Sequence, residues 1–216
     1  MPNVAQPTDA LTPPGVPAEL RDGSRVRIRE IRPSDRQLLM AGFERLSPES
    51  RYRRFLVPSP DLAGRMARYL TDVDHHDHEA MVALDEQSGD GVGVARYVRD
   101  PARPDTAEVA VTVVDDRQGL GLGTLLLDLI TARAREEGIR IFTALMLTEN
   151  REMRDLFDRL GPARTVDQAS GSTEIEVPIP AVGVAPELKR LLGIAARNEV
   201  AVPPAAGRQA ALPQIR

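Results

Sequence analysis

"AEVAVTVVDDRQGLGLGTLLLDLI", residues 107–130, changes its residue pattern twice within a short span. It begins with the alternating small and β-branched residues of a strand, and it ends with leucines at the three- and four-residue steps of a helix. Between the two segments lie Gly119, Gly121 and Gly123. Because glycine interrupts regular structure and lets another group approach the backbone closely, the pattern predicts a strand and a helix joined either by a plain turn or by a loop shaped around a ligand.

The spacing of these glycines decides between three phosphate-binding motifs. A P-loop requires a lysine after its last glycine, and none follows here. A dinucleotide fingerprint, G-x-G-x-x-G, does not fit either, because it requires a third glycine where this sequence has Thr124 or Leu126. The remaining pattern, Q-x-x-G-x-G, fits Gln118, Gly121 and Gly123. The first N–H groups of a helix have no partner within it and lie at the positive end of its dipole, so this loop is expected to bind a pyrophosphate.

The composition is that of a globular chain without a membrane segment. Its 216 residues, 42% hydrophobic and 28% charged, are enough for one domain with tails. The net charge of −4 provides no overall attraction to nucleic acid or to an anionic membrane. No apolar run approaches the ~18 residues of a membrane span, and the N-terminus lacks a signal-peptide pattern. The absence of cysteine excludes disulfides, thiolate ligands and a cysteine nucleophile, and we predict a cytoplasmic protein.

Proline-rich ends set the domain limits. Residues 1–22 contain five prolines and little periodicity, which predicts a disordered arm, and residues 200–216 are typical of a disordered tail. Between them we predict one domain over 23–181 and an amphipathic helix over 182–199. Strand and helix patterns alternate within the domain, so the fold class is α/β.

Local periodicity assigns the elements of this domain. The predicted strands are 24–32, 79–85, 91–98, 107–114, 139–147 and a closing hairpin of 163–168 and 172–180. Helices are predicted to begin near Pro33, Ser47, Asp61, the glycine loop and Asn150.

The strand–loop–helix segment resembles the acetyl-CoA-binding core of the GNAT N-acetyltransferases, and the order of elements is similar over about 24–180. "LTENREMRDLFDRLG", with Asn150, resembles the segment that follows the fifth strand in this family. "LSPESRYRRF", "VDHHDHEAMVAL", "GVGVARYVRDP" and "AEVAV" together are most similar to the bacterial Pat-type protein lysine acetyltransferases. The resemblance implies the GNAT acyl-CoA N-acyltransferase fold, a mixed and mostly antiparallel sheet with flanking helices.

The resemblance also implies an acetyl-CoA-dependent enzyme and the residues that bind its cosubstrate. Backbone amides of the loop would hold the pyrophosphate; the residues concerned are Gln118, Gly119, Leu120, Gly121, Leu122, Gly123 and Thr124. Thr112, Val113 and Val114 would pair with the pantetheine arm as an added strand would, and an N–H near Val113 would face the thioester oxygen. Asn150 completes this set, and no metal is expected.

Glu108 is implied as the general base. A lysine amine has a pKa near ~10.4 and arrives protonated at neutral pH, so it must lose a proton before it attacks. Glu108, Ala110 and Thr112 share one face of their strand, and the position of Glu108 matches the base of protein-acetylating relatives. We expect this carboxylate to be partly buried and to act directly or through one water. The alternative is an edge glutamate in water or paired with an arginine.

The general acid of many family members has no counterpart here. They carry a tyrosine seven residues after the asparagine, and that position is Phe157, which cannot donate a proton. Tyr97 and Tyr52 lack positional support as substitutes, so no acid is assigned. A thiolate can leave without full protonation or with water as the donor, and the lack of cysteine favours direct attack in a ternary complex.

Two clusters suggest other functions. "DHHDHE", residues 74–79, holds all three histidines but precedes a strand with no matching ligand cluster evident elsewhere, so a solvated loop or site rim is preferred to a metal site. "RYRRF", residues 51–55, fits nucleic acid poorly in an acidic chain. It is interpreted as a solvated helix face or, at the acceptor site, as a surface that selects an acidic protein.

Three functions are therefore weighed for the chain. The leading one is acetyl transfer to protein lysines, with acetyl-CoA and a lysine-bearing protein as partners. A small-molecule amine acetyltransferase and a non-catalytic acyl-CoA-binding sensor are the alternatives, and a homodimer is left open.

Overall fold

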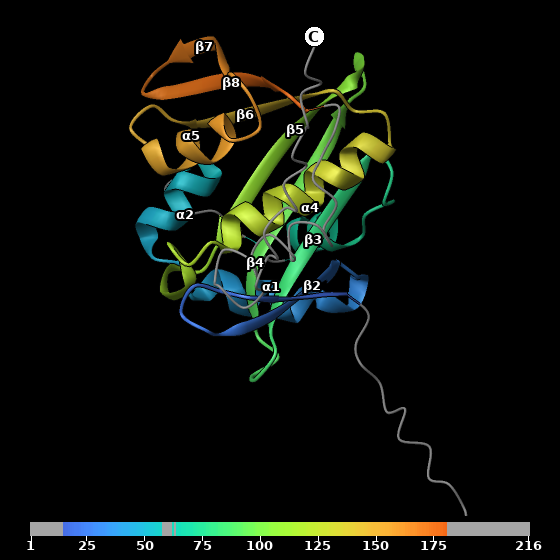
Figure 1. Cartoon of the computed structure of the whole chain (residues 1–216), viewed down its shortest axis with the longest axis vertical. Coiled ribbons are helices and arrows are strands. Elements are labelled where there is room, and N and C mark those ends of the chain that lie inside the picture. Colours follow the sequence, from blue (N-terminus) through green and yellow to red (C-terminus); the bar gives the residue numbers. More distant parts are fainter. Residues whose placement is uncertain (1–14, 58–61, 63, 181–216) are drawn as a thin grey trace, which may run out of the picture. The chain divides into compact units, whose positions relative to one another are not determined.

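A computed structural model describes residues 15–57, 62 and 64–180 (Figure 1). Its strands form one eight-stranded sheet in the order β1-β2-β3-β4-β5-β6-β8-β7. The strands are β1 Val16–Glu19, β2 Arg25–Glu30, β3 His78–Asp85, β4 Gly91–Asp100, β5 Arg103–Val113, β6 Ile141–Leu147, β7 Arg164–Ala169 and β8 Ser172–Pro178. The α-helices are α1 Arg36–Glu44, α2 Pro48–Phe55, α3 Arg65–Thr71, α4 Leu122–Glu136 and α5 Arg151–Asp158, with short 3-10 helices at Pro33–Asp35 and Asp115–Arg117. The strands and helices expected from periodicity are confirmed, most with bounds shifted by a few residues.

Every neighbouring pair in the sheet is antiparallel except β5 and β6. These two are parallel because α4 crosses over between them. Their pairing is short, joining Thr106–Glu108 to Ile141–Thr143. Beyond Glu108 the two strands are no longer paired, which opens the sheet toward the glycine loop.

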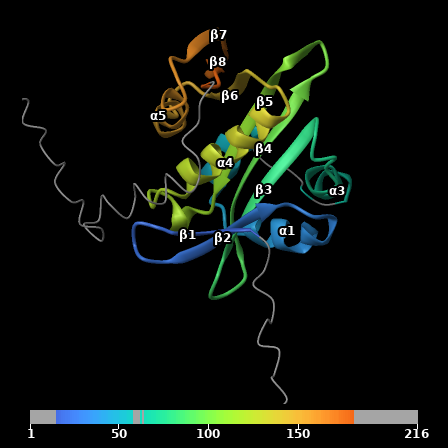
Figure 2. The same cartoon turned by 45° about the vertical axis from the view of Figure 1, so that its right-hand side comes forward.

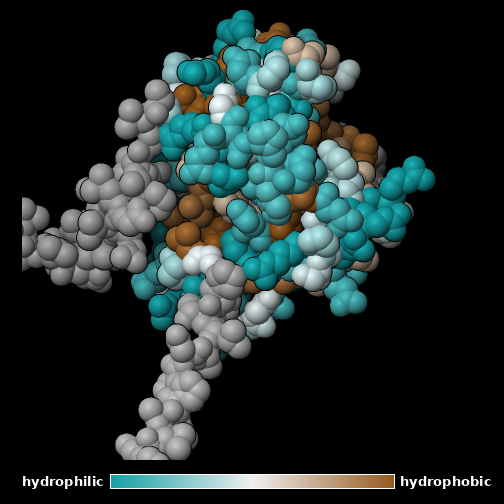
Figure 3. Space-filling model, turned by 90° about the vertical axis from the view of Figure 1, so that its right-hand side faces the viewer, coloured by the Kyte–Doolittle hydropathy of each residue, from teal (hydrophilic) through white to brown (hydrophobic). Residues whose placement is uncertain are grey.

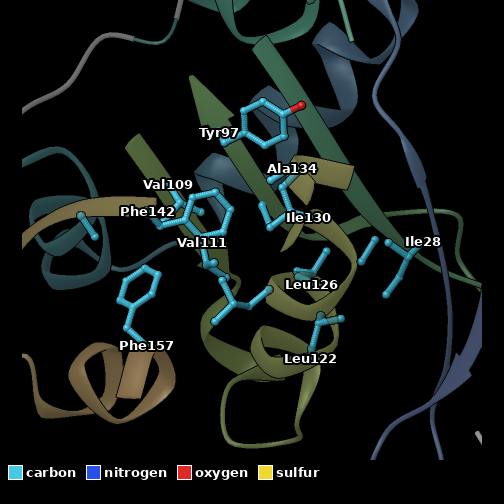
Figure 4. Close-up of a cluster of buried hydrophobic side chains, with 14 of the residues drawn as sticks. Ile28, Tyr97, Val109, Val111, Leu122, Leu126, Ile130, Ala134, Phe142 and Phe157 are labelled. Carbon is cyan, nitrogen blue, oxygen red and sulfur yellow. The ribbon is translucent and has the colours of Figure 1, made fainter. Parts of the chain in front are cut away.

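Helix α4 lies over β3, β4 and β5 (Figures 1 and 2). Its leucine and isoleucine positions form one stripe, because residues three and four apart share a helix face. Leu122, Leu126 and Ile130 are at most 1% exposed and pack beside Val109 and Val111 of β5 (Figure 4). Burial of each such side chain contributes about 1.5–3 kcal/mol, so this layer fixes β5 against the start of α4.

A second, smaller layer covers the opposite side of the sheet. Ile31, Ala80 and Val82 are buried there against Leu38 of α1 and Val94 of β4. Because successive side chains of a strand alternate between faces, the odd-numbered valines of β5 point to α4 and the even-numbered residues point to the side of α1–α3.

The prediction of a disordered arm over 1–22 is wrong for the C-terminal part of that range. Val16–Glu19 forms the edge strand β1, where Val16 pairs with Ile28. Pro17 obscured this strand, but a proline without an N–H is tolerated at a sheet edge. The predicted helix 182–199 and tail 200–216 lie outside the described residues.

The surface in the described ranges is largely hydrophilic on the face drawn in Figure 3, with apolar side chains in small patches. Within those ranges no helix combines the length and the apolar character that a membrane crossing requires.

Candidate active site

A cleft of about 340 Å³ opens where β5 and β6 separate. Val109–Val113 forms one wall, and Ala144–Met146 forms the other. Helix α2, the glycine loop and α5 close its remaining sides. The cleft therefore follows from the three-residue ladder between the two parallel strands, since a longer ladder would have filled it.

The edge of β5 presents free main-chain groups to this cleft. Thr112 pairs with Val94, and the Val114 N–H donates to the Val92 carbonyl at 3.1 Å, so the peptide groups of these two residues face β4. By alternation, those of Val111 and Val113 point to the cleft. An extended ligand can thus pair with the Val113 N–H, whereas the Val113 carbonyl accepts from the Gln118 amide and the main-chain groups of Thr112 and Val114 are used in the sheet.

The glycine loop positions the start of α4 beside the same edge. Gly119 and Gly121 have φ of 72° and 92°, a left-handed region that favours glycine, and Gly121 is the N-cap of α4. The first hydrogen bond of the helix runs from the Leu125 N–H to the Gly121 carbonyl. The N–H groups of Leu122, Gly123 and Thr124 precede that bond, so they are the unpaired donors that an anion requires.

Gly123 has a helical backbone that other residues also adopt, so its role is to leave space beside the helix. A Cβ built there would lie 3.7 Å from Leu156 of α5 and 3.9 Å from Val113, both ordinary contacts. Its side of the helix faces the cleft, so any larger side chain would project between β5 and α5.

The two polar residues before the loop fasten it to the sheet. The Gln118 amide donates to the Val113 carbonyl at 3.0 Å, and the Arg117 guanidinium binds the carboxylate of Asp85 at 2.8 Å. Both side chains line the cleft. Arg117 is therefore chiefly an anchor of the loop.

Arg21 is a residue of this loop region that the sequence did not reveal. Its N–H donates to the Leu120 carbonyl and its guanidinium donates to the Gly119 carbonyl, both at 3.2 Å. The composition of 1–22 predicts a disordered arm that includes Arg21, and no local pattern links this residue to a loop 98 residues away. It brings a positive charge to the start of α4.

Glu108 is the last residue of the ladder between β5 and β6, and it lines the cleft where that ladder ends. The expected partial burial is wrong, because its side chain is exposed in the open cleft. It shares the α1–α3 face with Ala110 and Thr112, as expected, and the charge of Glu108 acts on the guanidinium of Arg54. The carboxylate is thus accessible to an incoming amine.

Asn150 and Phe157 occupy the α5 side of the cleft. Asn150 is buried, and its side chain caps α5 by accepting from the Met153 N–H at 3.1 Å. Phe157 is 1% exposed. Tyr97 is buried beside α4 with its hydroxyl on the His76 carbonyl, and among the described residues that line the cleft there is no tyrosine, so neither Tyr97 nor Tyr52 replaces the missing acid.

The cleft unites about half of the expected site residues. Those that line it are Glu108, Thr112, Val113, Gln118, Gly119, Gly123 and Asn150. The others, Val114, Leu120, Gly121, Leu122 and Thr124, lie beside it, and Val114 and Leu122 are buried in the core. Sequence reasoning did not assign Arg53, Arg54 and Phe55 of α2 to the cleft wall, although it singled out their segment.

The histidine segment lies at the other end of α4. The expectation that no matching ligand cluster exists is wrong, because Glu30, His75 and Glu79 bring ligand atoms within 4.8 Å of one another. The fully buried Glu79 carboxylate, however, already accepts from His75 at 2.8 Å and lies 3.5 Å from Arg133 of α4. These interactions with His75 and Arg133 explain the cluster: it connects α4 to the sheet.

Comparison with known proteins matches the acetyltransferase (GNAT) family model to residues 41–161. "Acetyltransferase Pat" of Mycolicibacterium smegmatis is 36% identical over 177 residues, 82% of this chain and 52% of that protein. "Acetyltransferase PA5475" of Pseudomonas aeruginosa is 37% identical over 144 residues, 66% of this chain and 77% of that protein. The crystal structure of the GNAT domain of S. lividans PAT superimposes with a TM-score of 0.69 at 33% identity, covering 76% of this chain and 96% of that domain. The chain thus spans about half the length of the M. smegmatis relative.

Proposed function

Because the chain belongs to the acetyltransferase (GNAT) family, we propose that it transfers an acetyl group from acetyl-CoA to the side-chain amine of protein lysines. One observation carries the proposal: a single cleft holds unpaired helix amides at one end and an accessible carboxylate at the other. The similarity to Pat-type relatives supports a protein as the acceptor.

The glycine loop and the edge of β5 supply the binding half of the reaction. The N–H groups at the start of α4 fit a pyrophosphate, and Gly123 keeps the space beside them open. The peptide groups of Val111 and the N–H of Val113 face the cleft and fit the amides of a pantetheine arm. In this arrangement the Val113 N–H can also stabilise the negative charge that develops on the thioester oxygen.

Glu108 supplies the proton transfer. Its carboxylate takes one proton from the lysine ammonium, directly or through a water, and the neutral nitrogen then attacks the thioester carbon. A C–N bond forms, the C–S bond breaks, and the thiolate leaves as coenzyme A. Phe157 cannot protonate that thiolate, so solvent is the expected proton source.

Mass spectrometry of a protein extract incubated with labelled acetyl-CoA tests the acceptor. We expect new acetyl-lysines in the extract and little transfer to a panel of polyamines, amino acids and aminoglycosides. Lys189 is the only lysine of the chain, so self-labelling of side chains is confined to one position. Transfer to the small amines alone would replace the protein acceptor with a small molecule.

Glu108→Gln tests the chemistry. The variant should lose about 10²-fold or more in kcat while it retains affinity for coenzyme A, because an amide cannot accept the proton. Glu136→Gln, which removes an exposed carboxylate at the far end of α4, is the charge-matched control. Equal activity of Glu108→Gln and wild type would refute Glu108 as the base.

A second candidate function, an acyl-CoA-binding sensor, is favoured by one observation. The position of the family's tyrosine is the buried Phe157. Binding of coenzyme A without transfer to any amine would support the sensor.

A further inference from the structure

A second cavity adjoins the cleft on the α1–α3 side of the sheet. It holds about 60 Å³, and Arg54, Phe55 and Thr112 line both spaces. Leucine, valine and glycine make up most of its remaining lining, with Arg96 of β4 as its other charged residue. The cavity is thus an apolar recess that carries two guanidinium groups and adjoins the cleft that Glu108 lines.

Arg96 is a buried cation without an acidic partner. It is 5% exposed, and its guanidinium donates to the His78 imidazole at 2.9 Å and to the Leu70 carbonyl at 3.0 Å. Both acceptors are neutral, because an arginine cannot accept a hydrogen bond and the His78 Nε2 must therefore be unprotonated. Burial and the charge of Arg54 lower the pKa of Arg96 to about 9, so it remains a cation at neutral pH.

Arg54 of α2 is half-buried, and its guanidinium lies 4.9 Å from the centroid of the Phe55 ring. Within the described ranges no carboxylate lies within 4 Å of its guanidinium or of that of Arg96, whereas the adjacent Arg53 is paired with Glu49 at 2.6 Å. Burial lowers the pKa of Arg54, and the one acid whose charge opposes this is Glu108. The Glu108 carboxylate, the proposed base, thus acts on Arg54, while no carboxylate among the described residues offsets the charge of Arg96.

The charge balance worsens when the acceptor arrives. A lysine brings a third positive charge to a partly desolvated site, where like charges repel more strongly than in water. A carboxylate carried by one of the reactants would restore the balance, and a planar guanidinium binds a carboxylate through two parallel hydrogen bonds.

We infer that Arg54 and Arg96 form a carboxylate-binding subsite beside Glu108, which selects reactants that carry a carboxylate close to the reacting centre. The inference rests on the proposed function and deepens it. The carboxylate has two sources: an acidic side chain next to the acceptor lysine, or the free end of a dicarboxylic acyl thioester whose methylene groups occupy the apolar recess.

A two-by-two kinetic experiment separates these sources. Acetyl-CoA and succinyl-CoA are each combined with two peptides that differ only in glutamate or glutamine beside the lysine. In wild type we expect kcat/KM to rise about 10-fold or more with the glutamate peptide or with succinyl-CoA, whichever source the subsite uses. In Arg54→Gln that preference should fall to within about 2-fold, and Arg54→Lys should retain part of it.

Arg65→Gln on α3 is the control, since it removes an exposed guanidinium outside the cleft and should keep the full preference. Calorimetry with each thioester or peptide alone measures the same preference as a difference in affinity, in the absence of turnover. A preference that persists in Arg54→Gln, or equal values for all four combinations in wild type, would overturn the subsite. If neither peptide is acetylated but small amines are, the protein acceptor is refuted. The subsite is then tested by comparing kcat/KM for acetyl-CoA and succinyl-CoA with those small amines as acceptors.

Discussion

The guanidinium of Arg21 lies beside the loop that begins α4, where it donates to the Gly119 carbonyl. Its side chain is also near Gly121, at 3.8 Å from the Cβ that any other residue would carry there. A cation at this position adds to the unpaired amides of the helix start, and together they form a surface for a diphosphate.

Arg21→Gln should weaken binding of coenzyme A about 3- to 10-fold, because one charge-assisted contact is lost. Titration calorimetry measures the change. Arg25→Gln, which removes a side chain that is 69% exposed on β2, should leave the affinity unchanged. Equal affinities for both variants would show that Arg21 only fastens the loop.

At the level of elements, the glycine loop and the first turn of α4 place different demands on two glycines. Gly121 adopts φ of 92°, which costs a side-chain-bearing residue about 1–2 kcal/mol. Gly123 is helical and faces the cleft. Gly121 therefore permits the backbone conformation of the loop, and Gly123 leaves the space that the ligand is expected to occupy.

Alanine at each position should separate these roles. Gly121→Ala should lower the free energy of unfolding by about 1–2 kcal/mol. Gly123→Ala should keep or raise it, because alanine favours a helix, and should weaken coenzyme A binding by narrowing the cleft. Urea unfolding and calorimetry of both variants measure the two effects. A loss of stability in Gly123→Ala without loss of affinity would contradict this division.

The contact between α3 and the sheet depends on the charge state of His78. Its ring lies against that of Tyr69 of α3, with centroids 4.9 Å apart and planes tilted by 38°, and it accepts from Arg96 of β4. Burial and the charge of Arg96 lower the pKa of His78 to about 4, while Asp74 opposes and His75 reinforces the shift. The folded chain therefore prefers the neutral imidazole.

This preference predicts a pH dependence of stability. Between pH 6.5 and about 4 the unfolded chain binds a proton at His78 that the folded chain does not bind, so stability is complete above pH 6.5 and is lost as the pH falls through this window. His78→Gln, which retains an acceptor for Arg96, should flatten the slope. Urea unfolding from pH 4.5 to 7.5 compares the two proteins, and identical slopes would mean that His78 contributes nothing to it.

On the scale of the whole molecule, the parts found from sequence are those whose signal is local. Leucine spacing in 122–136 and the glycines before it predicted α4 and its loop, because helix faces and turn residues are set by near neighbours in the chain. The exposure of Glu108 could not be predicted in this way. It depends on where β5 and β6 separate, and their ladder joins residues more than thirty positions apart.

The missed contacts are long-range for the same reason. Arg21 meets the glycine loop only because β1 and β2 fold beside it, and Arg54 lines one cavity with Arg96 only because α2 lies over the sheet. The resemblance to a family placed Glu108 and the loop in one site, but it gave no indication that Arg54 and Arg96 line one cavity without a carboxylate within 4 Å among the described residues.

The sheet itself has a weak point that the ligand should strengthen. β1–β5 with α4 and β6–β8 with α5 are joined in the sheet only by the ladder at Thr106–Glu108. A ligand that enters the cleft as an added strand would contact both walls. Because such a ligand binds only the folded state, it should suppress local unfolding of the elements that contact it. Hydrogen exchange measures this region by region. Adding coenzyme A should slow exchange at least several-fold in β6, α5 and the Val111–Val113 edge of β5, with little change in β2 and β3, whereas a uniform slowing over all strands would show that the two walls already open and close as one unit.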